Sequence, residues 1–183
     1  MSDFYKTVKG VSQGIYREKM SRFLAFAEPV SSAEEARAVI KRYANEYLSS
    51  DNGEPSGTAG KPILGQINSF ELTNIVIVVI RYFGGIKLGT SGLINAYKTA
   101  ARDALDNSTI VEKTINEFYS LEFEYPLMNE VMRIMKEENL EQQNPRFELD
   151  CYLEFSTRKN DASRVFDKFD NLFGVKITHI KTM

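Results

Sequence analysis

The sequence predicts an α+β protein of two domains, and three observations lead to that prediction. Apolar residues alternate with polar ones in some stretches and recur at helical spacing in others, so strands and helices are both expected. The last 70 residues run in the order β-α-β-β-α-β, which is the ferredoxin-like pattern. Charge is also divided unevenly, with a net +3 over residues 1–104 and −5 over residues 105–183. We therefore expect one domain at 1–112 and a second at 113–183.

The first elements of the N-terminal domain are predicted to be a strand and a helix. Arg22–Val30 is rich in Phe and Ala, which favours a strand. Ser32 then begins a capping box with Glu35 three residues later. Apolar residues follow at helical spacing, which predicts an amphipathic helix to about Leu48.

A glycine-rich stretch separates this helix from an apolar strand. Eight of the eleven glycines lie within residues 53–92. Asp51–Gly65 also contains two prolines, so we expect it to be a loop. Ile75–Ile80 is continuously apolar and β-branched, which predicts a strand buried on both faces.

In the second domain, apolar residues recur every two residues in some segments and at a helical spacing of 3.6 residues in others. Strands are expected where Tyr119–Tyr125 and Phe147–Phe155 alternate apolar and polar residues, and Glu141–Gln143 is a partner strand before a proline. A Met-rich helix lies between the first two strands. Before a last short strand, a Phe-rich helix is stopped by Gly174.

The composition excludes several classes of protein. One Cys among 183 residues excludes an intramolecular disulfide, and one Cys with one His excludes Cys/His zinc sites. A histidine-based catalytic relay would need His179 itself as the base. The longest apolar run is too short to span a bilayer, and Met1–Lys9 does not resemble a signal peptide. We expect a cytoplasmic protein with no membrane partner, no cofactor and no metal.

The first glycine-rich motif, Gly53–Pro62, matches a P-loop only in part. The Walker spacing requires glycine where Pro55 stands, and Ser or Thr where Pro62 follows Lys61. Successive backbone N–H groups of such a loop can still form a nest for an anion. The alternative is a purely structural loop between helix and sheet.

The second motif, Arg81–Gly92, joins the end of a strand to a helix that Thr90 or Ser91 can cap. Free N–H groups and the helix dipole favour a phosphate at such a place, and Lys87 adds a cation. The glycines do not follow the Rossmann fingerprint. Phosphate binding and tight packing of helix on strand remain alternative interpretations.

The helix after Ser91 carries a polar face with Asn95, Lys98 and Arg102 at spacings of three and four residues. Together with Lys87 and Arg81, these side chains could line one basic surface that meets a nucleic-acid backbone. The alternative is a solvated helix face in which Arg102 pairs with Asp106.

Two long segments strongly resemble the Impact/YigZ family. They are Asp51–Leu64 (DNGEPSGTAGKPIL) and Asn74–Gly89 (NIVIVVIRYFGGIKLG). The resemblance implies a first domain like the second domain of ribosomal protein S5 and a ferredoxin-like second domain like domain V of translocating elongation factors. Family members carry a further strand-forming segment between the first helix and the glycine-rich loop. Here Tyr47 runs almost directly into Asp51, so either a strand has been lost or the sequence omits a stretch.

The resemblance implies a translation-linked regulator more than an enzyme, with RNA or the ribosome as partner. We name no catalytic residue. The candidate RNA- or phosphate-binding side chains are Lys61, Arg81, Lys87, Thr90, Ser91, Asn95, Lys98 and Arg102. The candidate glycine-loop positions are Gly53, Glu54, Ser56, Gly57, Thr58, Gly60, Gly84, Gly85 and Gly89.

Two other functions stay open from the sequence. One is a nucleotide- or phosphate-ligand-binding protein, or an enzyme, whose pocket is formed by the two glycine-rich loops. The other is a protein–protein regulator with a regulatory protein as its partner.

Overall fold

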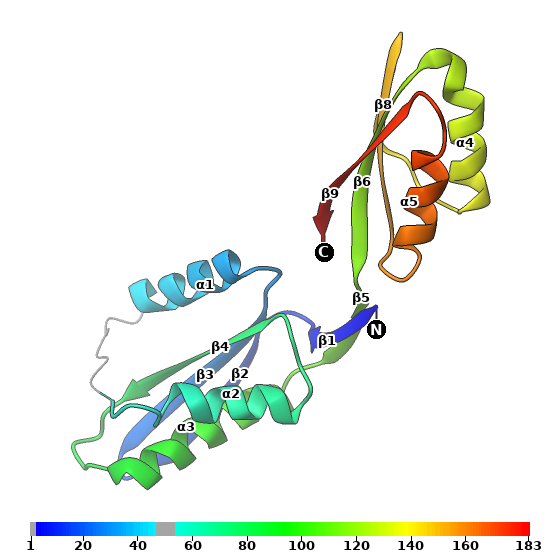
Figure 1. Cartoon of the computed structure of the whole chain (residues 1–183). Coiled ribbons are helices and arrows are strands. Elements are labelled where there is room, and N and C mark those ends of the chain that lie inside the picture. Colours follow the sequence, from blue (N-terminus) through cyan, green and yellow to red (C-terminus); the bar gives the residue numbers. More distant parts are fainter. Residues whose placement is uncertain (1–2, 47–53) are drawn as a thin grey trace. The chain divides into compact units, whose positions relative to one another are not determined.

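The computed structural model describes residues 3–46 and 54–183, which form two compact units (Figure 1). One unit is Lys6–Lys113, and the other combines the residues up to Tyr5 with Thr114–Met183. Both mix helices with antiparallel strands, so the predicted α+β class is confirmed. A two-stranded sheet pairs β1 (Phe4–Val8) with β5 (Ile110–Thr114), two strands that the sequence did not predict.

The unit Lys6–Lys113 contains a three-stranded antiparallel sheet in the order β2-β3-β4. The strands are β2 (Ser12–Glu18), β3 (Ser21–Pro29) and β4 (Ile75–Tyr82). The two strands that the sequence predicted here are β3 and β4, and both are confirmed within two residues at each end. β2 was not predicted.

Helices cover both faces of this sheet (Figure 1). They are α1 (Ala33–Glu46) on one face, and α2 (Gly60–Ser69) and α3 (Gly89–Asp106) on the other. Because side chains alternate along a strand, Phe23, Ala25 and Ala27 of β3 pack toward α3. Phe26 packs against α1 instead. β4 packs apolar side chains on both faces, as expected, with Ile75, Ile77 and Val79 on one side and Val76, Val78 and Ile80 on the other, but only Ile77 is buried and the others are partly buried.

Two helix starts differ from the prediction. α2 begins at Gly60, inside the stretch expected to be loop, because Pro62 is tolerated in a first turn where N–H groups have no helical partner. α3 begins at Gly89 with Leu88 at the N-cap and no side-chain cap. Thr90 and Ser91 therefore lie inside the first turn of α3 and do not cap it.

The capping box of α1 is present in a shifted form. The N–H of Glu35 donates to Ser32 Oγ at 3.1 Å, as expected. The Glu35 carboxylate accepts from the N–H and hydroxyl of Ser31, one residue earlier than the standard box requires. The Ser32 hydroxyl and the Glu35 carboxylate therefore still fix the start of α1.

The second unit has the ferredoxin-like topology that the sequence predicted. Its antiparallel sheet runs in the order β7-β8-β6-β9, and two helices follow β6 and β8. The elements are β6 (Asn116–Glu124), the 3-10 turn Tyr125–Leu127, α4 (Met128–Glu137), β7 (Gln143–Phe147), β8 (Asp150–Arg158), α5 (Ala162–Asp170) and β9 (Val175–Thr182).

The boundary between β7 and β8 corrects one prediction. β7 was expected to end before Pro145 but contains it, and Phe147 belongs to β7 rather than to β8. β7 is an edge strand, and its register with β8 shifts between Gln143 and Arg146. A proline is tolerated there because its missing N–H is not needed by the ladder.

The core of the second unit follows the alternation of its strands. Leu121 and Leu153 are fully buried against Val131, Val165 and Phe169 of the two helices. No helix in the described part of the chain is long and apolar enough to cross a membrane.

The lone Cys and His both lie in the second unit. Cys151 is buried, and its Sγ lies 3.3 Å from the carbonyl oxygen of Glu148. His179 on β9 forms a 2.7 Å hydrogen bond with Glu117. Neither residue lies in the unit that carries the glycine-rich motifs.

Candidate functional site

A polar cluster joins the two glycine-rich stretches of the unit Lys6–Lys113. Glu54, from the first stretch, accepts hydrogen bonds from Arg81 at the end of β4 (2.5 Å) and from the hydroxyl of Tyr97 on α3 (3.1 Å). The Glu54 and Arg81 side chains are only 22% and 15% exposed. The Arg81 guanidinium also lies over the rings of Phe23 (5.6 Å) and Phe83 (5.2 Å). Arg81, predicted as a phosphate ligand, is therefore engaged by Glu54.

The electrostatics of this cluster keep Tyr97 protonated. Burial raises the pKa of the Tyr97 phenol above its usual range, and the nearby Glu54 carboxylate raises that pKa further through its charge and the hydrogen bond. A protonated phenol can donate to Glu54, as the geometry requires. The cluster thus consists of one carboxylate held by two donors from different elements.

We predict that Tyr97 makes stability fall at alkaline pH. Below about pH 10 the phenol is protonated in both the folded and the unfolded chain, so its stabilising contribution is fully present. Above about pH 10 only the unfolded chain releases this proton, so the free energy of unfolding falls as pH rises toward the raised folded pKa. Urea denaturation from pH 9 to 11 should show the advantage of the native chain over Tyr97→Phe shrinking. Parallel curves would contradict this assignment.

The first glycine-rich stretch forms a tight turn before α2. The hydroxyl of Thr58 donates to the carbonyl oxygen of Pro55 at 2.7 Å, and Thr58 is fully buried. Gly57 has a φ of +81°, a conformation that favours glycine. Ser56 is exposed, and Gly60 begins α2 with open space around its Cα. Gly53 lies outside the described residues.

The glycines of the second stretch serve different purposes. The Gly84 N–H donates to Ser21 Oγ at 3.2 Å. A Cβ on Gly84 would lie 2.1 Å from the backbone carbon of Met20, so Gly84 permits close packing against the β2–β3 turn. Gly85 and Gly89 have open space around them but φ values of +86° and +74°.

The remaining predicted binding residues divide into free and engaged side chains. Arg102 pairs with Asp106 at 3.5 Å, and the Asn95 amide donates to the hydroxyl of Tyr16 at 3.2 Å. Thr90 and Ser91 are exposed in the first turn of α3. Of the predicted cations, Lys61, Lys87 and Lys98 are exposed and have no acidic partner among the described residues.

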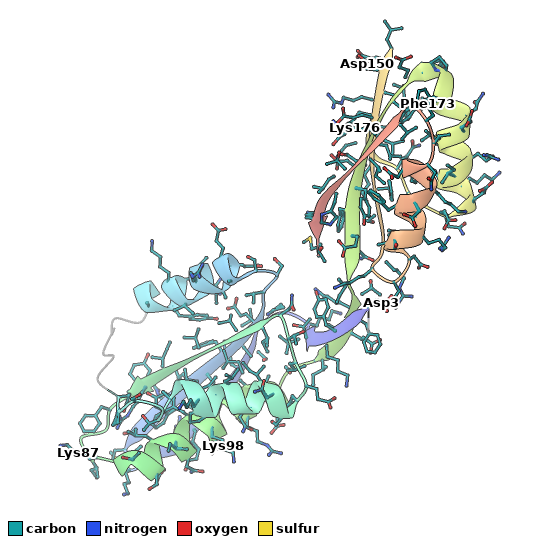
Figure 2. All side chains as sticks on the ribbon, in the orientation of Figure 1. Asp3, Lys87, Lys98, Asp150, Phe173 and Lys176 are labelled. Carbon is teal, nitrogen blue, oxygen red and sulfur yellow. The ribbon has the colours of Figure 1, made fainter. Side chains whose placement is uncertain are left out.

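The three free lysines lie on the layer formed by α2 and α3. Lys61 is in the first turn of α2. Lys87 precedes α3, and Lys98 lies on α3 (Figure 2). No group of three or more His, Cys, Asp or Glu residues in the described ranges is placed to hold a metal ion. The arrangement offers ammonium groups to an anion rather than a set of carboxylate ligands to a cation.

The sequence did not identify a second basic surface, at the β2–β3 turn. An open hollow of about 540 Å³ is lined by residues 17–22 and Tyr82. The strand register places Arg17 opposite Arg22, and Arg22 opposite Tyr82. The charges within residues 17–22 were visible in the sequence, but their arrangement depends on β2, which was not predicted.

Comparison with known proteins gives consistent matches. The family model described as the Impact N-terminal domain matches residues 43–105, which include both glycine-rich stretches. An IMPACT family member of Haemophilus influenzae is 30% identical over 159 residues, covering 74% of this chain and 76% of that protein. The IMPACT family member YigZ of Escherichia coli is 49% identical over 76 residues, which cover 42% of this chain and 37% of that protein.

A solved structure shares the fold. It is described as the crystal structure of a hypothetical protein and has a TM-score of 0.71 at 24% identity, covering 99% of both chains. At that identity the likeness concerns the fold alone.

Proposed function

The chain belongs to the IMPACT family, and we propose that it is a cytoplasmic, translation-linked accessory protein that binds RNA or the ribosome. The binding surface is the α2–α3 layer of the unit Lys6–Lys113, beside the glycine-rich stretches. The observation that carries the proposal is the set of three exposed lysines without acidic partners, Lys61, Lys87 and Lys98.

Electrostatics favour a polyanion at this surface. Residues 1–104 carry a net charge of +3, whereas the rest of the chain carries −5. Lysine ammonium groups bind phosphates and release counterions from a nucleic acid, which gives salt-dependent affinity. The exposed hydroxyls of Thr90 and Ser91 add donors near Lys87. Arg81 has no part in this surface because Glu54 holds it in a largely buried pair. The exposed pair of Arg102 with Asp106 is weak, so Arg102 stays a predicted contact.

We predict that Lys87→Ala combined with Lys98→Ala weakens RNA binding about tenfold. Each lost phosphate contact should lower the slope of log affinity against log salt by about 1, so the slope should fall by about 2. Fluorescence anisotropy with a labelled RNA at several salt concentrations measures both quantities.

The matched control for this variant is Arg133→Ala combined with Lys136→Ala. It removes the same charge from exposed positions on α4 of the other unit. Affinity should then stay close to that of the native chain. If both double variants bind RNA as the native chain does, the α2–α3 layer is not the binding surface.

A second candidate is a small phosphate ligand, bound or transformed where the two glycine-rich stretches meet. The observation that favours it is that the Glu54–Arg81 contact brings the two glycine-rich stretches together. A thermal-shift screen with inorganic phosphate, nucleotides and sugar phosphates tests it. The absence of any shift would count against it, and capture of a protein partner without RNA would favour the protein–protein regulator instead.

A further inference from the structure

Among the described residues, those that pack on the α1 face of the sheet cover only part of its length. Val39 and Tyr43 of α1 pack on Phe26, and Arg42 and Tyr43 both donate to Glu28. These contacts lie toward the end of β3. Nearer the β2–β3 turn, the side chains of this face are less covered, and Ile15 of β2 is 43% exposed.

A row of three side chains crosses this open part of the face, one from each strand. We call it the basic row, and it consists of Arg17, Arg22 and Tyr82. The register places them opposite one another on neighbouring strands, which lie about 4.8 Å apart. The Arg22 guanidinium stacks over the Tyr82 ring at 4.6 Å from its centroid. Tyr82 remains 39% exposed.

The two arginines of the basic row carry like charges at facing positions of β2 and β3, although Arg22 also stacks on Tyr82. Like charges directly opposite each other on neighbouring strands are destabilising. Among the described residues, no carboxylate forms an ion pair with Arg17 or Arg22. An anion from outside the chain would relieve this repulsion.

The turn beside the basic row stores backbone strain. Lys19 and Met20 form the two-residue connection between β2 and β3, with φ values of +46° and +66°. Such turns are usually built from Asn and Gly, because a side chain in this region costs about 1 kcal/mol or more. Lys19 nevertheless adds a third exposed cation next to the row. Strain of this kind collects at binding sites.

We propose that the basic row binds an unpaired segment of RNA, an inference that rests on the proposed function and adds a second contact site on the opposite face of the sheet. Arg17 and Arg22 contact phosphates, and a base stacks on the Arg22–Tyr82 pair. Bases of an unpaired strand stack on aromatic rings and guanidinium planes, whereas bases in a duplex already stack on each other. The hollow is open rather than enclosed, which suits a chain better than a small ligand.

The first test is substitution of Tyr82. Tyr82→Ala should lower the affinity for a 12-nucleotide unpaired RNA about tenfold, the size of effect expected for one lost base–aromatic stack. The affinity for a duplex of the same sequence should stay within about twofold, and Tyr82→Phe should bind both as the native chain does. Tyr125→Ala removes a tyrosine that is 59% exposed in the other unit and serves as the control.

The second test separates binding from folding. Arg17→Glu places a carboxylate opposite Arg22, which replaces a repulsive pair with an attractive one. The melting temperature should stay equal or rise, while the affinity for unpaired RNA falls at least tenfold. Opposite changes in stability and binding exclude misfolding as the cause of the lost affinity.

The outcomes that overturn the inference differ from those that overturn the proposed function. If Tyr82→Ala and Arg17→Glu leave unpaired RNA binding unchanged while the lysine double variant loses it, the basic row is not a binding site and the proposed function stands. If Tyr82→Ala weakens unpaired and duplex RNA equally, the stacking assignment is wrong. If the native chain binds no RNA, both proposals fail.

Discussion

Gly84→Ala should lower the free energy of unfolding of the unit Lys6–Lys113 by about 3 kcal/mol. The added Cβ would lie 2.1 Å from the carbon and 2.3 Å from the oxygen of the Met20 carbonyl, and 2.4 Å from the Ser21 nitrogen. All three are backbone atoms, so no side-chain rotation can relieve the overlap. The β2–β3 turn or the Gly84 loop must move, and the hydrogen bond from Gly84 to Ser21 is then lost.

Gly85→Ala is the matched control for that loss. Its Cβ would meet nothing within 4 Å, but its φ of +86° strains any other residue. The expected loss is therefore only about 1 kcal/mol. Urea denaturation followed by circular dichroism measures both variants. Equal losses would mean that a small movement of the loop relieves the overlap at Gly84, because Gly84, unlike Gly85, has no positive φ.

The different surroundings of Gly84 and Gly85 indicate the role of the second glycine-rich motif. From the sequence, phosphate binding and tight packing explained its glycines equally well. The overlap at Gly84 assigns that residue to packing, although the contact is with the β2–β3 turn and not with the helix that the sequence suggested. The positive φ values of Gly85 and Gly89 require glycine for conformation. No phosphate is needed to explain these three positions.

The second unit was predictable because its signals are local. Apolar residues alternate along β6 and β8, so the order of elements and the core followed from spacing alone. The prediction was wrong where Pro145 suggested the end of a strand, and where Gly174 was expected to stop the last helix, because α5 already ends at Asp170 with Asn171 as its C-cap. Whether an edge strand tolerates a proline depends on which strand lies at the edge, and that is not visible in sequence order.

The first unit was less predictable because its key features depend on distant residues. β2 ends in a turn made of Lys19 and Met20, which lacks the Asn-Gly signal of a hairpin. Sequence reasoning named Glu54 and Arg81 separately, but their contact spans 27 positions and appears only when β4 is placed beside the glycine-rich loop. The basic row likewise requires the register of three strands.

Arg81→Ala should lower the free energy of unfolding of the same unit by about 3 kcal/mol, because removal of one partner leaves a largely buried charge uncompensated. Glu54, only 22% exposed, would keep Tyr97 as its one remaining donor among the residues that the structure describes. The guanidinium that lies over Phe23 and Phe83 would also be lost. In a chain that already carries Glu54→Gln, no charge is left behind, so Arg81→Ala should cost about 1 kcal/mol. Urea denaturation of the four chains gives a coupling of about 2 kcal/mol.

The control for burial is Arg102→Ala, which breaks an ion pair whose side chains are 62% and 52% exposed. Its effect should stay below about 0.5 kcal/mol. A coupling near zero between Glu54 and Arg81 would show that their contact does not hold the two glycine-rich stretches together.

RNA affinity of the Arg81→Ala chain, measured well below its melting temperature, completes the test. Because Glu54 already engages Arg81, Arg81→Ala should reduce stability and leave RNA affinity unchanged. The reverse pattern, full stability with lost affinity, would return Arg81 to the role of a phosphate ligand.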